Sequence, residues 1–207
     1  MSGKSAETLE KKGNDFDLKS FWAAEQQEHI EVASKTFDTL KKEFSELLEL
    51  CAKSLPNGGK ILFFGNGGSA ADAQHLATEM TVRFVKDRAP LSAIALTTDT
   101  STLTAIGNDF GFDHLFSRQI DALGNPGDIA IGLSTSGNST NVLNALKAAR
   151  SKNIITAGFS GRDGGSMNEY CNVLLIVPSD STARIQEMHI TLGHMLCGAL
   201  EHKLGLV

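Results

Sequence analysis

Short continuous runs of apolar residues alternate with longer stretches of helical spacing over most of this chain. Such runs lack the in–out alternation of a half-buried strand and are typical of parallel strands covered on both faces. Five runs are expected to form strands: residues 61–64, 91–96, 129–133, 154–159 and 173–177. Helical spacing is found between them, as at 69–85 and 138–151, and again at 181–204. This pattern predicts an open, doubly wound α/β sheet that binds ligands beyond the carboxyl ends of its strands.

The segment before the first strand has a different rhythm. Apolar side chains recur there in the seven-residue pattern of a helix seam, at Ile30, Phe37, Phe44 and Cys51, with Ala33, Leu40 and Leu47 between them. We therefore expect one N-terminal helix over 18–56, ended by the Pro56–Gly59 turn, after a loose polar leader at 1–17 and before a domain at 57–207. Two interpretations of the seam stay open: packing on its own domain, or pairing between subunits.

Composition argues against several classes of protein. The 207 residues carry a net charge of −5, which gives no electrostatic reason to bind a nucleic-acid backbone. The longest run without polar residues, at 173–178, is far shorter than the roughly 20 residues of a membrane helix. Three cysteines without a CxxC spacing indicate reduced, packed thiols. With no apolar signal core near the N-terminus, we expect a cytoplasmic protein with no nucleic-acid or membrane partner.

Two predicted strand-to-helix turns carry candidate chemistry. The first contains Gly65, Asn66, Gly67, Gly68 and Ser69, and the second contains Ser134, Thr135, Ser136, Gly137, Asn138 and Ser139. Glycines allow close backbone approach, free amides at a helix start attract anions, and hydroxyls donate to phosphate oxygens. Either turn alone would also suit an ordinary helix cap. Two turns at the strand ends of one sheet predict a phosphorylated ligand, and neither fits the Rossmann or P-loop pattern.

The helix after the first turn has Asp72, His75, Glu79 and Arg83, the last three spaced by four residues on one expected face. A histidine and a carboxylate at this spacing can share a divalent metal, and the carboxylate can instead act as a base. A solvated face with an ion pair is the alternative.

The last predicted helix carries Gln186, Glu187 and His194. At about 100° per residue, spacing alone pairs Glu187 with His194 on one line of that helix. Asn108 and Asp109 end the segment after the second predicted strand. Two roles remain open for them: capping the loop, or contacting the hydroxyl groups of a sugar.

Several segments together resemble the sugar isomerase (SIS) family and, within it, the phosphoheptose isomerases. They are GNGGS at 65–69, AQHLATEM at 73–80, AIGNDFG at 105–111, STSGNS at 134–139 and RIQEMH at 184–189. The resemblance runs from about residue 20 to the C-terminus. It implies a flavodoxin-like three-layer sandwich with a five-stranded parallel sheet, an N-terminal oligomerisation helix and a homotetramer. The activity it implies is aldose–ketose isomerisation of sedoheptulose 7-phosphate to D-glycero-D-manno-heptose 7-phosphate, the first step of heptose supply for lipopolysaccharide or related glycans.

The resemblance also implies roles for individual residues. Glu79 and His194 are the expected catalytic acid–base pair, and the zinc ligands are expected to be His75, Glu79, Gln186 and His194. The implied substrate contacts are Asn66, Gly67, Gly68, Ser69, Glu79, Arg83, Asn108, Asp109, Ser134, Thr135, Ser136, Ser139 and Gln186. Here the family pattern selects Gln186, whereas spacing alone selects Glu187.

Two relatives of this family give alternative functions. The DnaA initiator-associating protein shares the fold and the RIQEMH segment but is a non-catalytic regulator, and that group lacks an acid at position 79 and a histidine at 194. This chain has both, which favours the enzyme. An arabinose 5-phosphate isomerase is the other alternative, but such proteins usually carry an accessory domain for which 207 residues leave no room.

Overall fold

The computed structural model describes residues 16–207, so the predicted leader lies outside the described residues except for Phe16 and Asp17. Five parallel strands form one sheet in the order β2-β1-β3-β4-β5. The strands are β1 (Ile61–Gly65), β2 (Ala93–Ala95), β3 (Ile129–Leu133), β4 (Ile155–Gly161) and β5 (Val173–Val177). This is the flavodoxin-like order, so the predicted fold class is confirmed.

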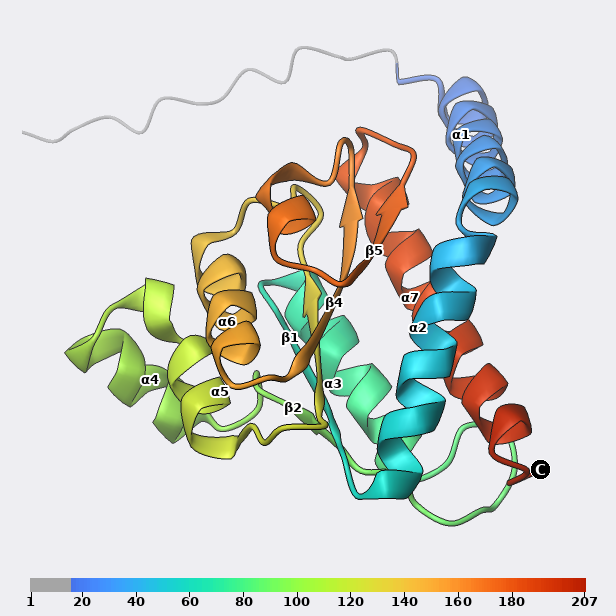
Figure 1. Cartoon of the computed structure of the whole chain (residues 1–207). Helices are drawn as coiled ribbons and strands as arrows, with labels where there is room; N and C mark the ends of the chain where they lie inside the picture. Colours follow the sequence, from blue (N-terminus) through green and yellow to red (C-terminus); the bar gives the residue numbers. More distant parts are fainter. Residues whose placement is uncertain (1–15) are drawn as a thin grey trace, which may run out of the picture.

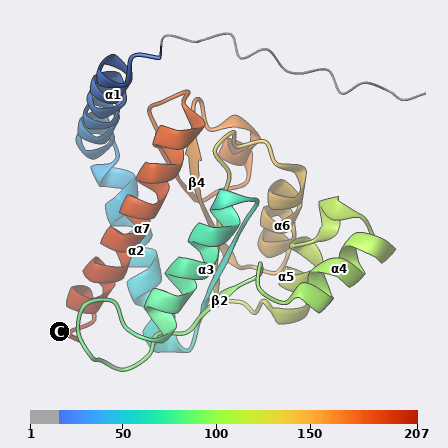
Figure 2. The same ribbon diagram turned by 180° about the vertical axis from the view of Figure 1, so that it is seen from behind.

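Helices cover both faces of the sheet and make three layers (Figures 1 and 2). Alternate residues of β1 point to opposite faces: Ile61 and Phe63 belong to one buried cluster, Leu62 and Phe64 to the other. The first cluster includes residues of α2 (Lys41–Ser54), α3 (Gly68–Thr81) and α7 (Thr182–Lys203). The second includes residues of α4 (Thr100–Asp109), α5 (Ser117–Leu123) and α6 (Thr140–Ser151).

The predicted single helix over 18–56 is wrong in detail. The chain forms α1 (Leu18–Thr39), then α2, and ends in a 3-10 turn at Leu55–Asn57. The interruption lies at Leu40, with φ −99° and ψ 8°, and contains neither proline nor glycine. Asp17 begins α1 because its carboxylate accepts hydrogen bonds from the backbone amides of Lys19 and Ser20. The bonds from the Ser20 hydroxyl and the Ser20 backbone amide lower the pKa of Asp17.

The heptad seam divides at the same point. Leu40, Leu47 and Cys51 are buried against the chain's own domain, as the first interpretation predicts for this half. Ile30 and Phe37 on α1 remain about half exposed. An apolar groove of about 340 Å³ lies beside Phe37, between α1, α2 and α7. Ile30 and Phe37, in the first half of the seam, therefore lack full cover within the described chain.

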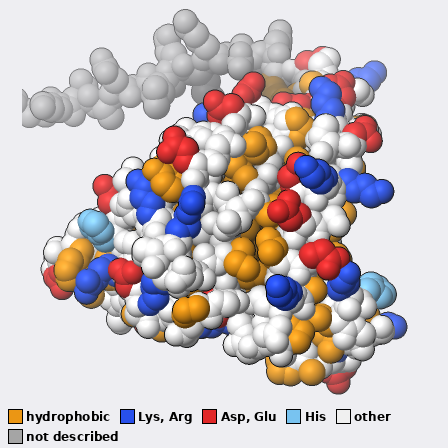
Figure 3. Space-filling view, in the orientation of Figure 1, with side chains coloured by type: hydrophobic (Ala, Val, Ile, Leu, Met, Phe, Trp, Pro, Cys, Tyr) orange, Lys and Arg blue, Asp and Glu red, His pale blue; other side chains and the backbone are white. Residues whose placement is uncertain are grey.

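Other boundaries moved by a few residues. β2 keeps only three of the six residues expected at 91–96, and α3 ends at Thr81 rather than 85. The three cysteines are free, as expected, and burial raises the pKa of the Cys51 and Cys197 thiols to about 12. Within residues 16–207, no helix combines the length and apolar character needed to cross a bilayer. Acidic and basic side chains are interspersed on the face seen in Figure 3.

Candidate active site

The first predicted loop is built for close backbone packing at the end of β1. A Cβ on Gly65 would lie 2.8 Å from the Leu133 carbonyl oxygen and 2.8 Å from the Ser69 Cβ. Gly67 has φ +56° and precedes the first turn of α3, a conformation that favours glycine. A Cβ on Gly68 would lie 1.7 Å from Nε2 of Gln186, so the Gln186 amide covers the start of α3.

The second loop leads from β3 into α6. The Ser134 and Ser139 hydroxyl oxygens lie 3.0 Å apart, and the Asn138 backbone amide donates to the Ser136 Oγ over 3.2 Å. Ser139 is the N-cap residue of α6, but its side chain makes no capping hydrogen bond. The helix start therefore offers free backbone amides beside a cluster of hydroxyls, which is the arrangement that binds phosphate.

A pair of asparagines joins the two loops. Asn66 and Asn141 exchange two side-chain hydrogen bonds of 2.8 Å each, linking the β1–α3 loop to the first turn of α6. β1 and β3 are neighbours in the sheet, with Gly65 opposite Leu133, which brings the loops together. The prediction that both loops lie at one sheet edge is confirmed. The sequence does not mark Asn141, because it lies two residues beyond the STSGNS segment, inside a helical pattern.

His75, Glu79 and His194 form a cluster whose ligating atoms all lie within 4.8 Å of one another. The two histidine Nε2 atoms are 2.8 Å apart, and the His75 Nε2 lies 3.3 Å from the Glu79 Oε1. Nitrogens this close need a proton or a cation between their lone pairs, and imidazole with carboxylate is a donor set suited to zinc. The three residues, which we call the triad, therefore fit a metal site.

Close helix packing brings the triad together. α3 carries His75 and Glu79, α7 carries His194, and the two helices run side by side (Figure 2). A Cβ on Gly193 would lie 2.5 Å from the Leu76 Cδ2, so only glycine allows α7 to approach this closely at the residue before His194. The neighbouring pair Gly193 and Leu76 thus sets the separation of the two histidines.

Two expectations about helix faces are wrong. Arg83 lies beyond the end of α3, is exposed, and is not on the helix face of His75 and Glu79. Glu187 does not pair with His194: its carboxylate accepts from Arg184 over 2.7 Å and lies 2.8 Å from the His29 Nδ1. Glu187 therefore connects α7 to α1. The expectation failed because spacing along one helix cannot show which neighbouring helix a side chain contacts.

Asp72 stands one turn before His75 on α3. One of its carboxylate oxygens is buried without a hydrogen-bond partner. Burial raises the pKa of Asp72 to about 6, against the opposing charge interaction with His75. The first half of α3 therefore carries one carboxyl group, that of Asp72, whose pKa lies above its ordinary value because of burial.

His189 occupies the core between α7 and β4. Its side chain is fully buried, its Nε2–H donates to the Ser160 carbonyl oxygen over 3.0 Å, and its Nδ1 has no partner. Burial lowers its pKa to about 4, partly offset by the bond to Ser160. The ring is therefore neutral in the folded protein at pH 7.

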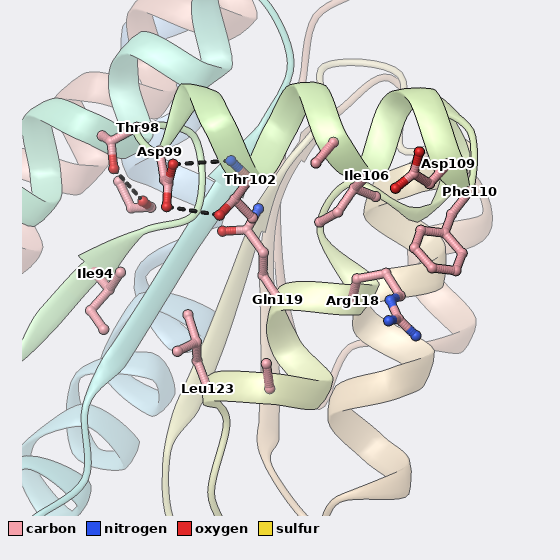
Figure 4. Close-up of a pocket in the computed structure, with 13 residues that line it drawn as sticks. Ile94, Thr98, Asp99, Thr102, Ile106, Asp109, Phe110, Arg118, Gln119 and Leu123 are labelled. Carbon is pink, nitrogen blue, oxygen red and sulfur yellow. Dashed lines mark hydrogen bonds between the residues drawn. The ribbon is translucent and has the colours of Figure 1, made fainter.

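Asn108 and Asp109 form the last turn of α4, where the Asn108 amide donates to the Asp109 carboxylate over 2.7 Å. In the described part of the chain, no hydrogen bond joins either residue to the triad. Asp109 lies at one end of a cavity of about 470 Å³ between β2, α4 and α5, with Phe110 and Arg118 beside it (Figure 4). The Arg118 guanidinium stacks 4.2 Å from the centre of the Phe110 ring.

These features define a phosphosugar-binding α/β domain, and comparison with known proteins identifies the family. The SIS domain family matches residues 26–161, so this chain belongs to that family. It is 59% identical over 174 residues to the phosphoheptose isomerase of Paramagnetospirillum magneticum, covering 84% of this chain and 91% of that protein.

Solved structures agree with this assignment. A phosphoheptose isomerase from Neisseria gonorrhoeae superposes with a TM-score of 0.85 at 48% identity, covering 90% of this chain and 100% of that one. One from Francisella tularensis gives a TM-score of 0.87 at 35% identity, with the same coverage.

Proposed function

We propose that this chain is an aldose–ketose isomerase that converts sedoheptulose 7-phosphate to D-glycero-D-manno-heptose 7-phosphate, the first step of heptose precursor supply for lipopolysaccharide or related glycans. The observation that carries the proposal is the triad on α3 and α7, two turns beyond the first loop, which the Asn66–Asn141 pair joins to the second loop with its hydroxyl cluster. Identity of 59% to a phosphoheptose isomerase over most of both chains supports the same reaction. The regulatory alternative has no support here, because it expects neither Glu79 nor His194.

The distance between the two parts of the site suits a long, phosphorylated sugar. His75 follows Gly68 by seven residues, which is about 10 Å along a helix. A seven-carbon sugar phosphate in an extended conformation has a comparable length. A phosphate held at the loops would therefore anchor the sugar with its carbonyl end near the triad, and this binding energy orients the reacting carbons.

The reaction requires one proton to leave C1 of the ketose and one to be added at C2. Loss of the C1 proton to a base gives a cis-enediolate, O2 gains a proton, O1 loses one, and proton return to C2 gives the aldose. Glu79 and His194 are the groups we assign to these transfers, since one is a carboxylate and the other an imidazole within the triad. The lone pairs used by a base are also those used by a metal ligand, so the two roles compete.

Zinc is the metal we propose, one ion per subunit, held by His75, Glu79 and His194 with Gln186 as the fourth ligand. When bound, it would polarise the carbonyl oxygen or stabilise the enediolate. The Gln186 side chain rests against Gly68 at the start of α3, so ligation requires it to turn along that helix toward the triad.

Substrate contacts are proposed for the two loops and for five further positions. The residues are Asn66, Gly67, Gly68, Ser69, Glu79, Arg83, Asn108, Asp109, Ser134, Thr135, Ser136, Ser139 and Gln186. The hydroxyl cluster and free amides of the second loop support a phosphate there. We also propose a cytoplasmic location and a homotetramer, which the exposed Ile30 and Phe37 on α1 support.

The decisive experiment incubates the purified full chain and added zinc with sedoheptulose 7-phosphate in deuterated water. We expect an aldoheptose 7-phosphate carrying deuterium at C2. Glu79→Gln should lower turnover by about 10²–10⁴-fold, the usual range for a positioned acid or base. Glu46→Gln, an exposed carboxylate on α2, is the matched control and should leave turnover unchanged.

Each outcome decides a separate point. Absence of any aldoheptose product from the wild-type chain with metal supplied would refute the isomerase. Recovery of most Glu79→Gln activity in excess zinc would assign Glu79 to metal binding alone. Wild-type turnover by Glu79→Gln without metal would remove both roles from this residue.

A further inference from the structure

The segment between α3 and β2 covers His194. The Phe84 ring stacks on the His194 imidazole, with ring centres 5.5 Å apart and planes inclined by 27°. His75 meets the same imidazole edge-on, with ring centres 5.0 Å apart and the two Nε2 atoms 2.8 Å apart. A Cβ on Gly198, one turn along α7, would lie 3.3 Å from the Phe84 Cε1. The imidazole therefore contacts both Phe84, through its face, and His75, through its Nε2.

A buried ion pair anchors Phe84. The Phe84 backbone amide donates to the Glu201 Oε1 over 3.1 Å, and the Arg88 Nε donates to the same oxygen over 2.8 Å. The Arg88 and Glu201 side chains are only 1% and 2% exposed. Burial by itself would raise the pKa of Glu201, but the hydrogen bond and charge of Arg88 hold it below its ordinary value. The carboxylate is thus ionised, as a strong acceptor for both donors requires.

The same arginine reaches the end of α3. Its Nη2 donates to the Glu79 carbonyl oxygen and its Nη1 to the Met80 carbonyl oxygen, each over 2.7 Å. These carbonyls belong to the last turn of the helix, which lacks intrahelical partners and carries partial negative charge. Arg88 therefore connects three parts of the molecule: the backbone of Glu79, the segment carrying Phe84, and α7 through Glu201.

We propose that Phe84 is a positioning residue for His194, and that the Arg88–Glu201 pair fixes the segment so that the ring of Phe84 restricts the imidazole to its orientation beside His75 and Glu79. The inference rests on the proposed role of His194 in proton transfer. Without the ring, the imidazole is free to rotate into the space that Phe84 fills. Misplacing a catalytic group by about 1 Å can cost about 10²-fold in rate. Phosphate binding at the loops is independent of this contact.

The test compares steady-state kinetics of the wild-type full chain with Phe84→Leu, Phe84→Tyr and Val85→Ala. Phe84→Leu should lower kcat about 10–100-fold while KM stays within about twofold, because the loops are intact. Phe84→Tyr keeps an aromatic ring and should retain most of the wild-type kcat. Val85→Ala alters an exposed neighbour in the same segment and should match the wild type. Arg88→Lys keeps a positive charge beside Glu201, but a single ammonium group cannot bind all the acceptors that the Arg88 guanidinium binds. This variant should therefore lower kcat at constant KM.

A second measurement separates this inference from the proposed function. An aromatic ring shifts the resonances of protons stacked on it, so the carbon-bound imidazole protons of His194 in the NMR spectrum should move in Phe84→Leu and stay near their wild-type values in Phe84→Tyr. Unchanged resonances in Phe84→Leu would overturn the stacking contact even if the wild type were inactive. With an active wild type, a normal kcat in Phe84→Leu, or a loss that Phe84→Tyr shares, would overturn the positioning role. If Phe84→Leu did not fold, Arg88→Lys with the wild-type kcat would overturn it.

Discussion

Replacing His189 with glutamine removes a titrating ring from the core while keeping a donor for the Ser160 carbonyl oxygen. The pKa of His189 is lowered by burial from 6.5 to about 4. Between these two pH values the unfolded chain binds a proton at this ring that the folded chain does not. The free energy of unfolding therefore falls as the pH falls, by about 1.4 kcal/mol per pH unit and roughly 3 kcal/mol in total. This contribution is fully present above pH 6.5.

Urea unfolding of the wild type and His189→Gln at equal chain concentration, from pH 7.5 to 4.5, measures this contribution. Other titrating groups are common to both proteins and cancel in the difference between the two curves. We expect the variant to be less stable at pH 7.5, since glutamine fills the site less well, and to lose less stability on acidification. Parallel pH dependences would refute the assignment of His189 as a neutral buried ring.

Three further perturbations test the packing, the phosphate loop and the exposed seam. Gly193→Ala should destabilise the fold by about 1–3 kcal/mol in urea unfolding, because its methyl group would collide with Leu76; alanine in an unhindered helix would instead stabilise it. Ser136→Ala should raise KM for the sugar phosphate about tenfold or more, and equal inhibition of both proteins by inorganic phosphate would contradict this. Phe37→Ser should shift the mass in light scattering below that of a tetramer, since each large buried side chain contributes about 1.5–3 kcal/mol; an unchanged mass would exclude Phe37 from the interface.

Strands and strand-end loops could be predicted because their signals are local. The apolar runs that form β3 and β5 have sharp boundaries, and the pattern predicts both strands over the residues that form them. The glycines of the first loop were predictable because tight turns select that residue type. The interruption at Leu40 has no such signal, since the heptad pattern of apolar residues continues across it.

Side-chain partners within the candidate site were harder to predict, because they depend on how the helices pack. Spacing along α7 suggested Glu187 for His194, but α1 lies near enough to bring His29 to Glu187 instead. Nothing in the sequence marked Arg88, whose importance comes from acceptors on two different helices. A chemical role can thus be assigned to a motif residue from sequence, whereas its supporting contacts require the fold.

The contacts of the first two helices have a consequence for how the chain is made. α2 packs on β5 and α7, and the Arg184 guanidinium of α7 donates to the Glu25 carbonyl oxygen of α1. The elements that leave the ribosome first therefore find their partners only when the last ones emerge, on the order of ten seconds later at typical elongation rates. During translation the apolar side chains of α2, including Leu47, lack their native cover. Nascent chains stalled before α7 should consequently bind chaperones that full-length chains release.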